Sequence, residues 1–325
     1  MAVAFNTDHE VEYGAVEQIS PLIRRITAEN PSKFTFKGTG TFIVGQGDDV
    51  AVIDPGPRDE AHLRAVLDAV RGETVTHVLI THTHGDHSPA TAGLVARTGA
   101  RTFGFGPHPA GAVSEAEHAS ADIDRDGGEP ADPDEVARRA EQAERERPDT
   151  DFVPDEELRH GDRVDGTGWS MEVLHTPGHI SNHLCFALAE ESALFTGDHV
   201  MGWSTTIVPP PDGDMAAYLH SLRLVAARPE SIYYPTHGPA ISDPVPHVEA
   251  LLAHRLERER QIVDQLRRGP TTIEAMVREL YADVAEELHK PAARSVHAHL
   301  VALLAEGQVV SDTGPATPDA TYSLG

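Results

Sequence analysis

Residues 77–94 of the chain read "HVLITHTHGDHSPATAGL" and carry a dense cluster of side chains that can bind a metal. Within six residues stand His82, His84, Asp86 and His87. The chain has 325 residues and 20 histidines, so this pattern would also arise by chance in about one such chain in two hundred. The cluster therefore favours a metal site but needs partners elsewhere in the sequence.

The cluster lies between two predicted elements. Residues 75–80, "VTHVLI", predict a strand, and residues 88–99 predict a helix with Ser88 as its cap. Upstream, the apolar runs at 41–44 and 50–53 predict two short strands, and residues 58–70 have helical spacing. The four side chains are thus expected on a loop that leaves a strand, where a rigid scaffold commonly presents functional groups.

Three later segments supply further candidate ligands. They are "HTPGHISNH" at 175–183, "FTGDHV" at 195–200 and "YPTHGP" at 234–239. Each ends an apolar run and contains Gly or Pro, which favour a turn at a strand end. Histidine and aspartate at the ends of several strands are typical of a metal site in a sheet protein, and these ligands suit zinc.

In this order the motifs resemble the metallo-β-lactamase fold superfamily over roughly residues 15–245. The resemblance implies an α/β (α+β) fold, the αββα sandwich of two mixed sheets between helices. It also implies two zinc ions per chain. One ion would be held by His82, His84 and His179, the other by Asp86, His87 and His237, with Asp198 between them. Asp54, in "VIDPG", matches a position that usually supports the ligands.

Two positions narrow the choice within the superfamily. Iron-binding flavodiiron proteins typically have Glu where this chain has His84, so zinc is favoured. Two subclasses of true β-lactamase have Cys where this chain has Asp198, which argues against antibiotic hydrolysis.

The end of the chain extends the resemblance. "GDHVMGWSTT" and "PTHGPAI" are similar to the β-lactamase-like protein 2 group, which includes a mitochondrial endoribonuclease and fungal acyl-carrier-protein thioesterases. Beyond Val248 we predict three helices, one opening with a capping box from Thr271 to Glu274, and a hairpin of "QVV" and "TYSL". We therefore expect a catalytic domain at 1–247 and a winged-helix-like domain at 248–325.

An acidic insertion is predicted at about residues 108–160. Between Ala112 and Glu157 there are 17 acidic and five basic residues. Its composition is typical of a solvated surface segment, and a lid over the site is the alternative.

The resemblance implies a hydrolase that attacks a small acyl ester, thioester or related substrate through a metal-bridging hydroxide. Asp86 would bind one zinc and act in catalysis, as orienter of the nucleophile and proton relay. Candidates for supporting or substrate-contacting roles are His183, Trp203 and Thr205. The alternatives are a metal-dependent endoribonuclease and a transcription regulator with an inactive hydrolase domain.

Composition bears on partners and location. The net charge of −26 disfavours nucleic acid, and the five arginines between residues 254 and 269 are interleaved with acids, although RNA contact stays possible. The single cysteine, Cys185, fits a reducing compartment. The first residues lack the pattern of a signal peptide, and no apolar run is long enough for a membrane span. We expect a cytoplasmic enzyme with a small-molecule substrate and no membrane association; its oligomeric state is not indicated.

Overall fold

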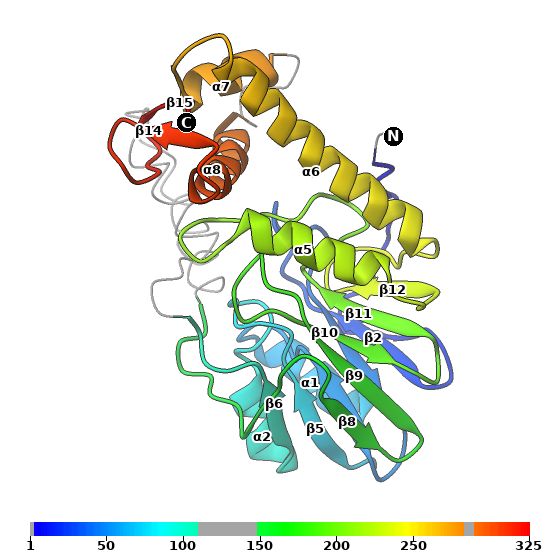
Figure 1. Cartoon of the computed structure of the whole chain (residues 1–325). Coiled ribbons are helices and arrows are strands. Elements are labelled where there is room, and N and C mark those ends of the chain that lie inside the picture. The colour runs from blue at the N-terminus through cyan, green and yellow to red at the C-terminus, as the bar shows by residue number, and fades with distance from the viewer. Residues whose placement is uncertain (1–2, 110–147, 283–288) are drawn as a thin grey trace, which may run out of the picture.

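The computed structural model of the chain describes residues 3–109, 148–282 and 289–325. Two β-sheets pack face to face, helices cover their outer faces, and a small module of helices and short strands follows at the carboxyl end (Figure 1). This confirms the expected αββα sandwich. The predicted insertion at about 108–160 lies mostly outside the described residues, so its role as surface segment or lid stays a prediction.

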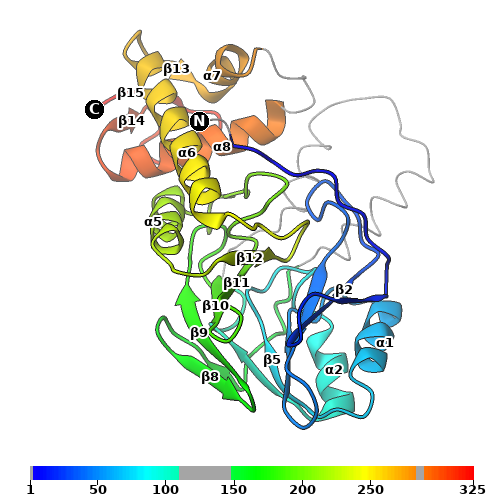
Figure 2. The same ribbon diagram turned by 90° about the vertical axis from the view of Figure 1, so that its right-hand side faces the viewer.

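The first sheet has seven strands in sequence order. They are β1 (Val16–Gln18), β2 (Ile23–Thr27), β3 (Gly40–Val44), β4 (Val50–Ile53), β5 (Val75–Leu79), β6 (Arg101–Gly104) and β7 (Glu156–Glu157). The strands from β1 to β4 pair antiparallel, and those from β4 to β7 pair parallel. Helices α1 (Glu60–Ala69) and α2 (Thr91–Thr98) connect parallel strands and lie together on one side of this sheet (Figure 2).

The second sheet has five strands in the order β12-β11-β10-β9-β8. They are β8 (Arg163–Gly166), β9 (Trp169–His175), β10 (Leu184–Leu188), β11 (Ala193–Gly197) and β12 (Ile232–Pro235). Only β11 and β12 are parallel, and α5 (Met215–Ala226) connects them on the opposite side of the sandwich from α1 and α2 (Figure 2).

The core between the sheets is built from alternate residues of both. Phe42 of the first sheet packs against Phe195 of the second, with ring centroids 5.0 Å apart, and Trp169 and Phe186 are buried in the same cluster. Burying each such side chain contributes roughly 2–3 kcal/mol. The lone cysteine, Cys185, points the other way from β10 and is buried among residues of the cluster beneath α5.

The carboxyl-terminal module contains α6 (Pro244–Leu266), α7 (Ile273–Leu280), α8 (His289–Ala305), β13 (Thr271–Thr272), β14 (Val309–Ser311) and β15 (Thr321–Leu324). The predicted hairpin is confirmed, because β14 and β15 pair antiparallel. β13 adds a third strand that the sequence did not indicate. α6 begins four residues before the expected boundary at 247/248 and leads from the sandwich into this module (Figure 1).

Two predicted helix caps are wrong. The cap of α7 is Thr272, whose side chain accepts from the N–H of Ala275. Thr271 and Thr272 both lie in β13, paired with Tyr322 and Thr321, so the helix begins one residue later than predicted. Ser88 does not cap α2, which begins after Ala90. The Ser88 hydroxyl instead donates to Asp149, 2.8 Å away. A local sequence pattern cannot predict this bond, because Asp149 is distant along the chain.

Among the described residues, no helix combines the length and apolar character needed to cross a bilayer.

Candidate metal centre

The predicted ligands meet because of strand direction. β9, β11 and β12 run the same way, so the segments that follow them emerge at one edge of the second sheet. His179, Asp198 and His237 lie on these segments. The loop after β5 of the first sheet brings residues 82–87 to the same place. Loops from both sheets thus bring these side chains together.

Glycines in the motifs permit close approach. Gly197 has φ +51°, and a Cβ there would lie 2.5 Å from Nε2 of His183. Gly178 has φ +144°, and a Cβ there would lie 2.4 Å from Cα of Tyr218 in α5. A side chain at either position would push the neighbouring ligand away from the site.

The first group of side chains is made of three histidines. Nδ1 of His84 lies 3.0 Å from Nε2 of His82 and 2.9 Å from Nε2 of His179. Burial lowers the pKa of all three rings. Neutral rings whose nitrogens face one another in this way present converging lone pairs, which is the arrangement that a metal ion requires.

The second group combines a carboxylate and two histidines. Oδ2 of Asp86 lies 3.1 Å from Nε2 of His237 and 3.4 Å from Nε2 of His87. Burial lowers the pKa of His237, but Asp198 and Asp86 outweigh it and raise that pKa to about 10. The two carboxylates therefore favour a positive charge at this position, which a bound divalent cation would supply in place of the proton.

Asp198 stands between the two groups. Its Oδ2 lies 3.8 Å from Nε2 of His179 in the first group. Its Oδ1 lies 3.4 Å from Nε2 of His237 and 3.5 Å from Nε2 of His87 in the second. One carboxylate therefore faces both groups, as a bridging ligand would.

Asp54 lies behind the ligands and is fully buried. Its Oδ2 accepts from Nδ1 of His87 at 2.8 Å, and its Oδ1 accepts from the N–H of Thr81 at 2.8 Å. Asp54 has φ +47°, a conformation that costs a non-glycine residue on the order of 1 kcal/mol or more. This contact turns Nε2 of His87 toward Asp86 and Asp198.

Backbone carbonyls orient two other rings. Nδ1 of His179 donates to the carbonyl of Ile207 at 2.7 Å, and Nδ1 of His237 donates to the carbonyl of Gly38 at 3.2 Å. Each bond holds its ring so that Nε2 is aimed inward. Thr39 adds a hydroxyl that donates to Oδ2 of Asp86 at 3.1 Å. The sequence did not predict these groups. Every residue has a backbone carbonyl, so no residue type indicates which carbonyl bonds to a ligand ring.

The donor atoms are of the kind and spacing that could hold metal. They form three overlapping groups whose ligand atoms lie within 4.8 Å of one another: His82, His84 and His179; His82, His87 and Asp198; Asp86, His87 and His237. Among the described residues, Nε2 of His87 and Oδ1 of Asp198 are buried without a hydrogen bond. Such atoms are costly unless something binds them, and the nitrogen and oxygen donors are those that zinc and similar ions take.

The remaining candidates occupy different positions. His183 is fully buried; its Nε2 accepts from the N–H of Asp198 at 3.1 Å, and its Nδ1 donates to the hydroxyl of Thr176 at 2.8 Å. Trp203 and Thr205 are partly exposed on the segment after Asp198. Trp203 stacks on Phe36, with ring centroids 4.8 Å apart and planes at 14°.

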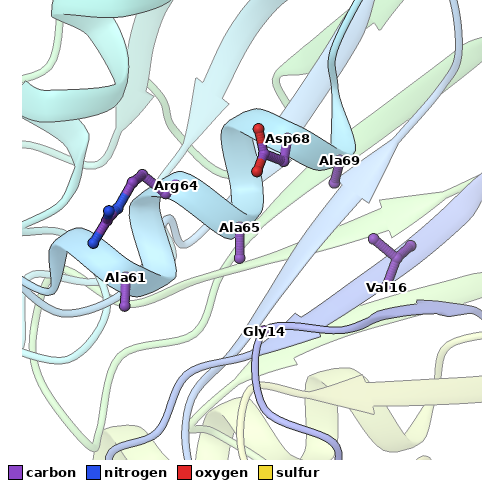
Figure 3. Close-up of a pocket in the computed structure, with 7 residues that line it drawn as sticks. All are labelled: Gly14, Val16, Ala61, Arg64, Ala65, Asp68 and Ala69. Atoms are coloured by element: carbon purple, nitrogen blue, oxygen red, sulfur yellow. The ribbon is translucent and has the colours of Figure 1, made fainter.

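A pocket of about 490 Å³ lies elsewhere, between α1 and the amino-terminal segment (Figure 3). Ala61, Ala65 and Ala69 of α1 point toward Gly14 and Val16 across it. None of its lining residues belongs to the three metal-binding groups.

Family models match both parts of the chain. The model described as "Metallo-beta-lactamase superfamily" matches residues 36–237. The model described as "Beta-lactamase associated winged helix domain" matches residues 272–316.

Three curated relatives match more than three quarters of the chain. The lactamase-like protein notP of Aspergillus sp. (strain MF297-2) is 32% identical over 77% of this chain and 66% of its own length. An atrochrysone carboxyl ACP thioesterase of Aspergillus chevalieri is 31% identical over 85% of this chain and 79% of its own length. Another of that name, from Pseudocercospora fijiensis (strain CIRAD86), is 30% identical over 86% of this chain and 73% of its own length.

Two solved structures share the whole fold. A beta-lactamase domain protein from Burkholderia ambifaria has a TM-score of 0.72 at 21% identity, covering 99% of this chain and 97% of that one. A metallo-beta-lactamase family protein from Thermus thermophilus has a TM-score of 0.68 at 24% identity, covering 94% and 100%.

Proposed function

Because the chain belongs to the metallo-β-lactamase superfamily of hydrolases, we propose that it hydrolyses acyl thioesters at a pair of zinc ions. The observation that carries the proposal is the placement of Asp198 between two groups of metal-binding side chains. Relatives 30–31% identical over at least 85% of the chain are named ACP thioesterases, which favours a thioester over another acyl ester.

The seven proposed ligands are His82, His84 and His179 for one ion, Asp86, His87 and His237 for the other, and Asp198 for both. Two bound zinc ions would acidify water and polarise the carbonyl oxygen of the substrate. Zinc is preferred to magnesium, calcium and manganese because most of the donors are imidazole nitrogens.

Asp86 is the proposed catalytic residue. Thr39 and His237 both contact its Oδ2, at 3.1 Å each, so Oδ1 is the oxygen left to accept a hydrogen bond from the attacking water. The same carboxylate can then pass the proton to the sulfur as the carbon–sulfur bond breaks. Burial alone would raise the pKa of Asp86, but His87 and His237 lower it and keep the carboxylate ionised.

We propose that the acyl group lies against the stacked rings of Trp203 and Phe36. A Cβ at Gly238 would lie 2.8 Å from the Trp203 ring, so this pair directly adjoins His237. Trp203 is partly exposed, and its Nε1 lies in the part of the ring that is buried. The exposed part of the stacked pair is apolar and suits a flat acyl group. Thr205, on the same segment, is the second proposed substrate contact.

The ribonuclease alternative has weaker support. Two exposed arginines are already paired with carboxylates: Arg260 of α6 with Glu257 and Asp264, and Arg267, directly after α6, with Asp264. Paired arginines do not form the free basic stripe that binds phosphates. The buried, free thiol of Cys185 fits the proposed cytoplasmic location.

The test uses the full chain loaded with zinc. Thiol release is measured from an N-acetylcysteamine thioester of an aromatic acid, and cleavage of a fluorescent RNA is measured in parallel. We expect thiol release that is lost in Asp86→Asn and retained in Asp165→Asn, a matched change of an exposed carboxylate. RNA cleavage without thiol release would contradict the thioesterase proposal and support the ribonuclease alternative.

A further inference from the structure

We propose that Arg255, on α6 of the carboxyl-terminal module, is a positioning residue for the metal centre. The proposal rests on the metal site of the proposed function, but not on its substrate. Arg255 contacts none of the seven proposed ligands. It acts through the segment Thr206–Ile207, which touches two of them.

The guanidinium of Arg255 is deeply buried, with 5% of the residue exposed. It donates to the carbonyl of Thr206 and, at 3.2 Å, to the hydroxyl of Ser295 on α8. It also lies over the ring of Tyr218 in α5, 5.6 Å from the centroid. Within residues 3–109, 148–282 and 289–325, no carboxylate approaches it closely enough for an ion pair.

A buried cation without a carboxylate partner is expensive to keep, because dipoles and an aromatic face replace its water only in part. Packing between α6 and α5 could be achieved by an apolar side chain at lower cost. The chemistry that only a guanidinium provides here is a charged donor to the carbonyl of Thr206.

The segment held by Arg255 reaches the metal centre in two ways. The hydroxyl of Thr206 lies 2.6 Å from the carbonyl of Asp198 and 3.0 Å from that of His199, and its proton is shared between them. The carbonyl of the next residue, Ile207, accepts from Nδ1 of His179 at 2.7 Å. Asp198 is the bridging candidate, and His179 belongs to the first group.

A single anchor therefore fixes the backbone of one ligand and the ring orientation of another. Removing supporting contacts of this kind lowers metal affinity by roughly 10–100-fold in metal sites. The carboxyl-terminal module, through α6, thereby contributes to the geometry of a site that it does not touch.

The test compares Arg255→Met with Arg260→Met, a matched change on the same helix. Arg260 is exposed and paired with Glu257 and Asp264. Each full-length variant is titrated with zinc against a chromophoric chelator, and its cobalt(II) form is examined by visible absorption. We expect roughly 10–100-fold weaker metal binding and an altered cobalt spectrum in Arg255→Met, no change in Arg260→Met, and partial rescue in Arg255→Lys.

Thr206→Val supplies a second route that keeps Arg255 and the volume of the side chain. We expect it to weaken metal binding as well. The double variant should bind metal no more weakly than the single variant that has the lower affinity, because both changes release the same segment. If Arg255→Met does not fold, Thr206→Val and Arg255→Lys still carry the test.

Unchanged metal affinity and an unchanged cobalt spectrum in folded Arg255→Met would overturn the inference. It would also be overturned if the fold-loss of metal affinity in the double variant equalled the product of the fold-losses in the two single variants. The proposed function can fail separately: a wild-type chain that binds two metal ions but releases no thiol would overturn the thioesterase proposal and leave the role of Arg255 standing. A wild-type chain that binds no metal would overturn both.

Discussion

The ring of His183 accepts a hydrogen bond from the backbone N–H of Asp198 at 3.1 Å. The carboxylate of Asp198 meanwhile faces His87 and His237. The backbone of the proposed bridging ligand is thus held by a buried imidazole that contacts the ligand from behind.

The first prediction follows from this contact. His183→Leu removes the acceptor and leaves a buried N–H without a partner, which costs roughly 1–3 kcal/mol and loosens Asp198. We expect metal affinity to fall by roughly 10–100-fold, measured by chelator competition. His175→Leu is the control, because His175 bonds to the carbonyl of Ser181 and not to a ligand. Equal effects of the two changes would count against a specific role for His183.

The second prediction concerns Asp86. Asp86→Asn keeps the shape of the side chain but removes the negative charge beside His237 and the proton acceptor. We expect the rate of thioester hydrolysis to fall by roughly 10²–10⁴-fold, with the folded structure retained by circular dichroism. Turnover close to that of the wild type would remove Asp86 from the mechanism.

The third prediction concerns metal loading. Elemental analysis of the purified chain should find about two zinc ions per chain. Since the ligand side chains are buried and come together only in the folded chain, bound metal should stabilise the fold, by about 4 kcal/mol when its free concentration is a thousand times Kd. Chelation should then lower Tm by roughly 5–10 °C. His82→Ala, which removes a member of two of the groups, should show a smaller shift, and an equal one would place the metal elsewhere.

The fourth prediction concerns acid stability and His62 of α1. Burial lowers the pKa of His62 to about 4, and its Nε2 donates to the hydroxyl of Thr41 at 2.8 Å. The unfolded chain, with a pKa near 6.5, takes up this proton first as the pH falls. The stabilisation from His62 is therefore complete above about pH 6.5 and is lost between pH 6.5 and 4, by roughly 2–3 kcal/mol.

The measurement compares urea unfolding of the wild type and His62→Gln at pH 7.5 and pH 4.5. The difference in stability between them should shrink at the lower pH, because only the wild type loses the contribution of His62. A difference that stays constant or grows would show that the ring is already charged in the folded protein.

Local sequence patterns predicted secondary structure correctly where the conformation of a residue depends on its neighbours along the chain. The runs at 41–44 and 50–53 became β3 and β4, and "VTHVLI" became β5. β3 and β4 are buried along their whole length, so a continuous apolar run was a reliable signal there. The local pattern failed at Ser88, whose hydroxyl bonds to the distant Asp149. It also failed at Thr271, because the pairing of β13 with β15 moves the start of α7 one residue further along the chain.

The site was predictable only as a set of residue types in order. The resemblance named seven ligands, and the structure brings their donor atoms together; their assignment to two zinc ions stays a prediction, as does the division into domains at 247/248. The carbonyls of Gly38 and Ile207 left no trace in the sequence because every residue has a carbonyl. The interleaved charges at 254–269 did not distinguish Arg255, which is buried, from Arg260, which is exposed.

Cys185 has a practical consequence. It is the single cysteine of the chain, and burial raises the pKa of its thiol to about 12. The thiolate is the reactive form of cysteine, so the folded enzyme should not react with a colorimetric thiol reagent. The colour in the thioesterase assay would then come only from the thiol that the reaction releases. The same lack of reactivity makes the chain a clean background for labelling: a cysteine placed at an exposed position such as Arg260 would be the one attachment point for a fluorophore or spin label on α6.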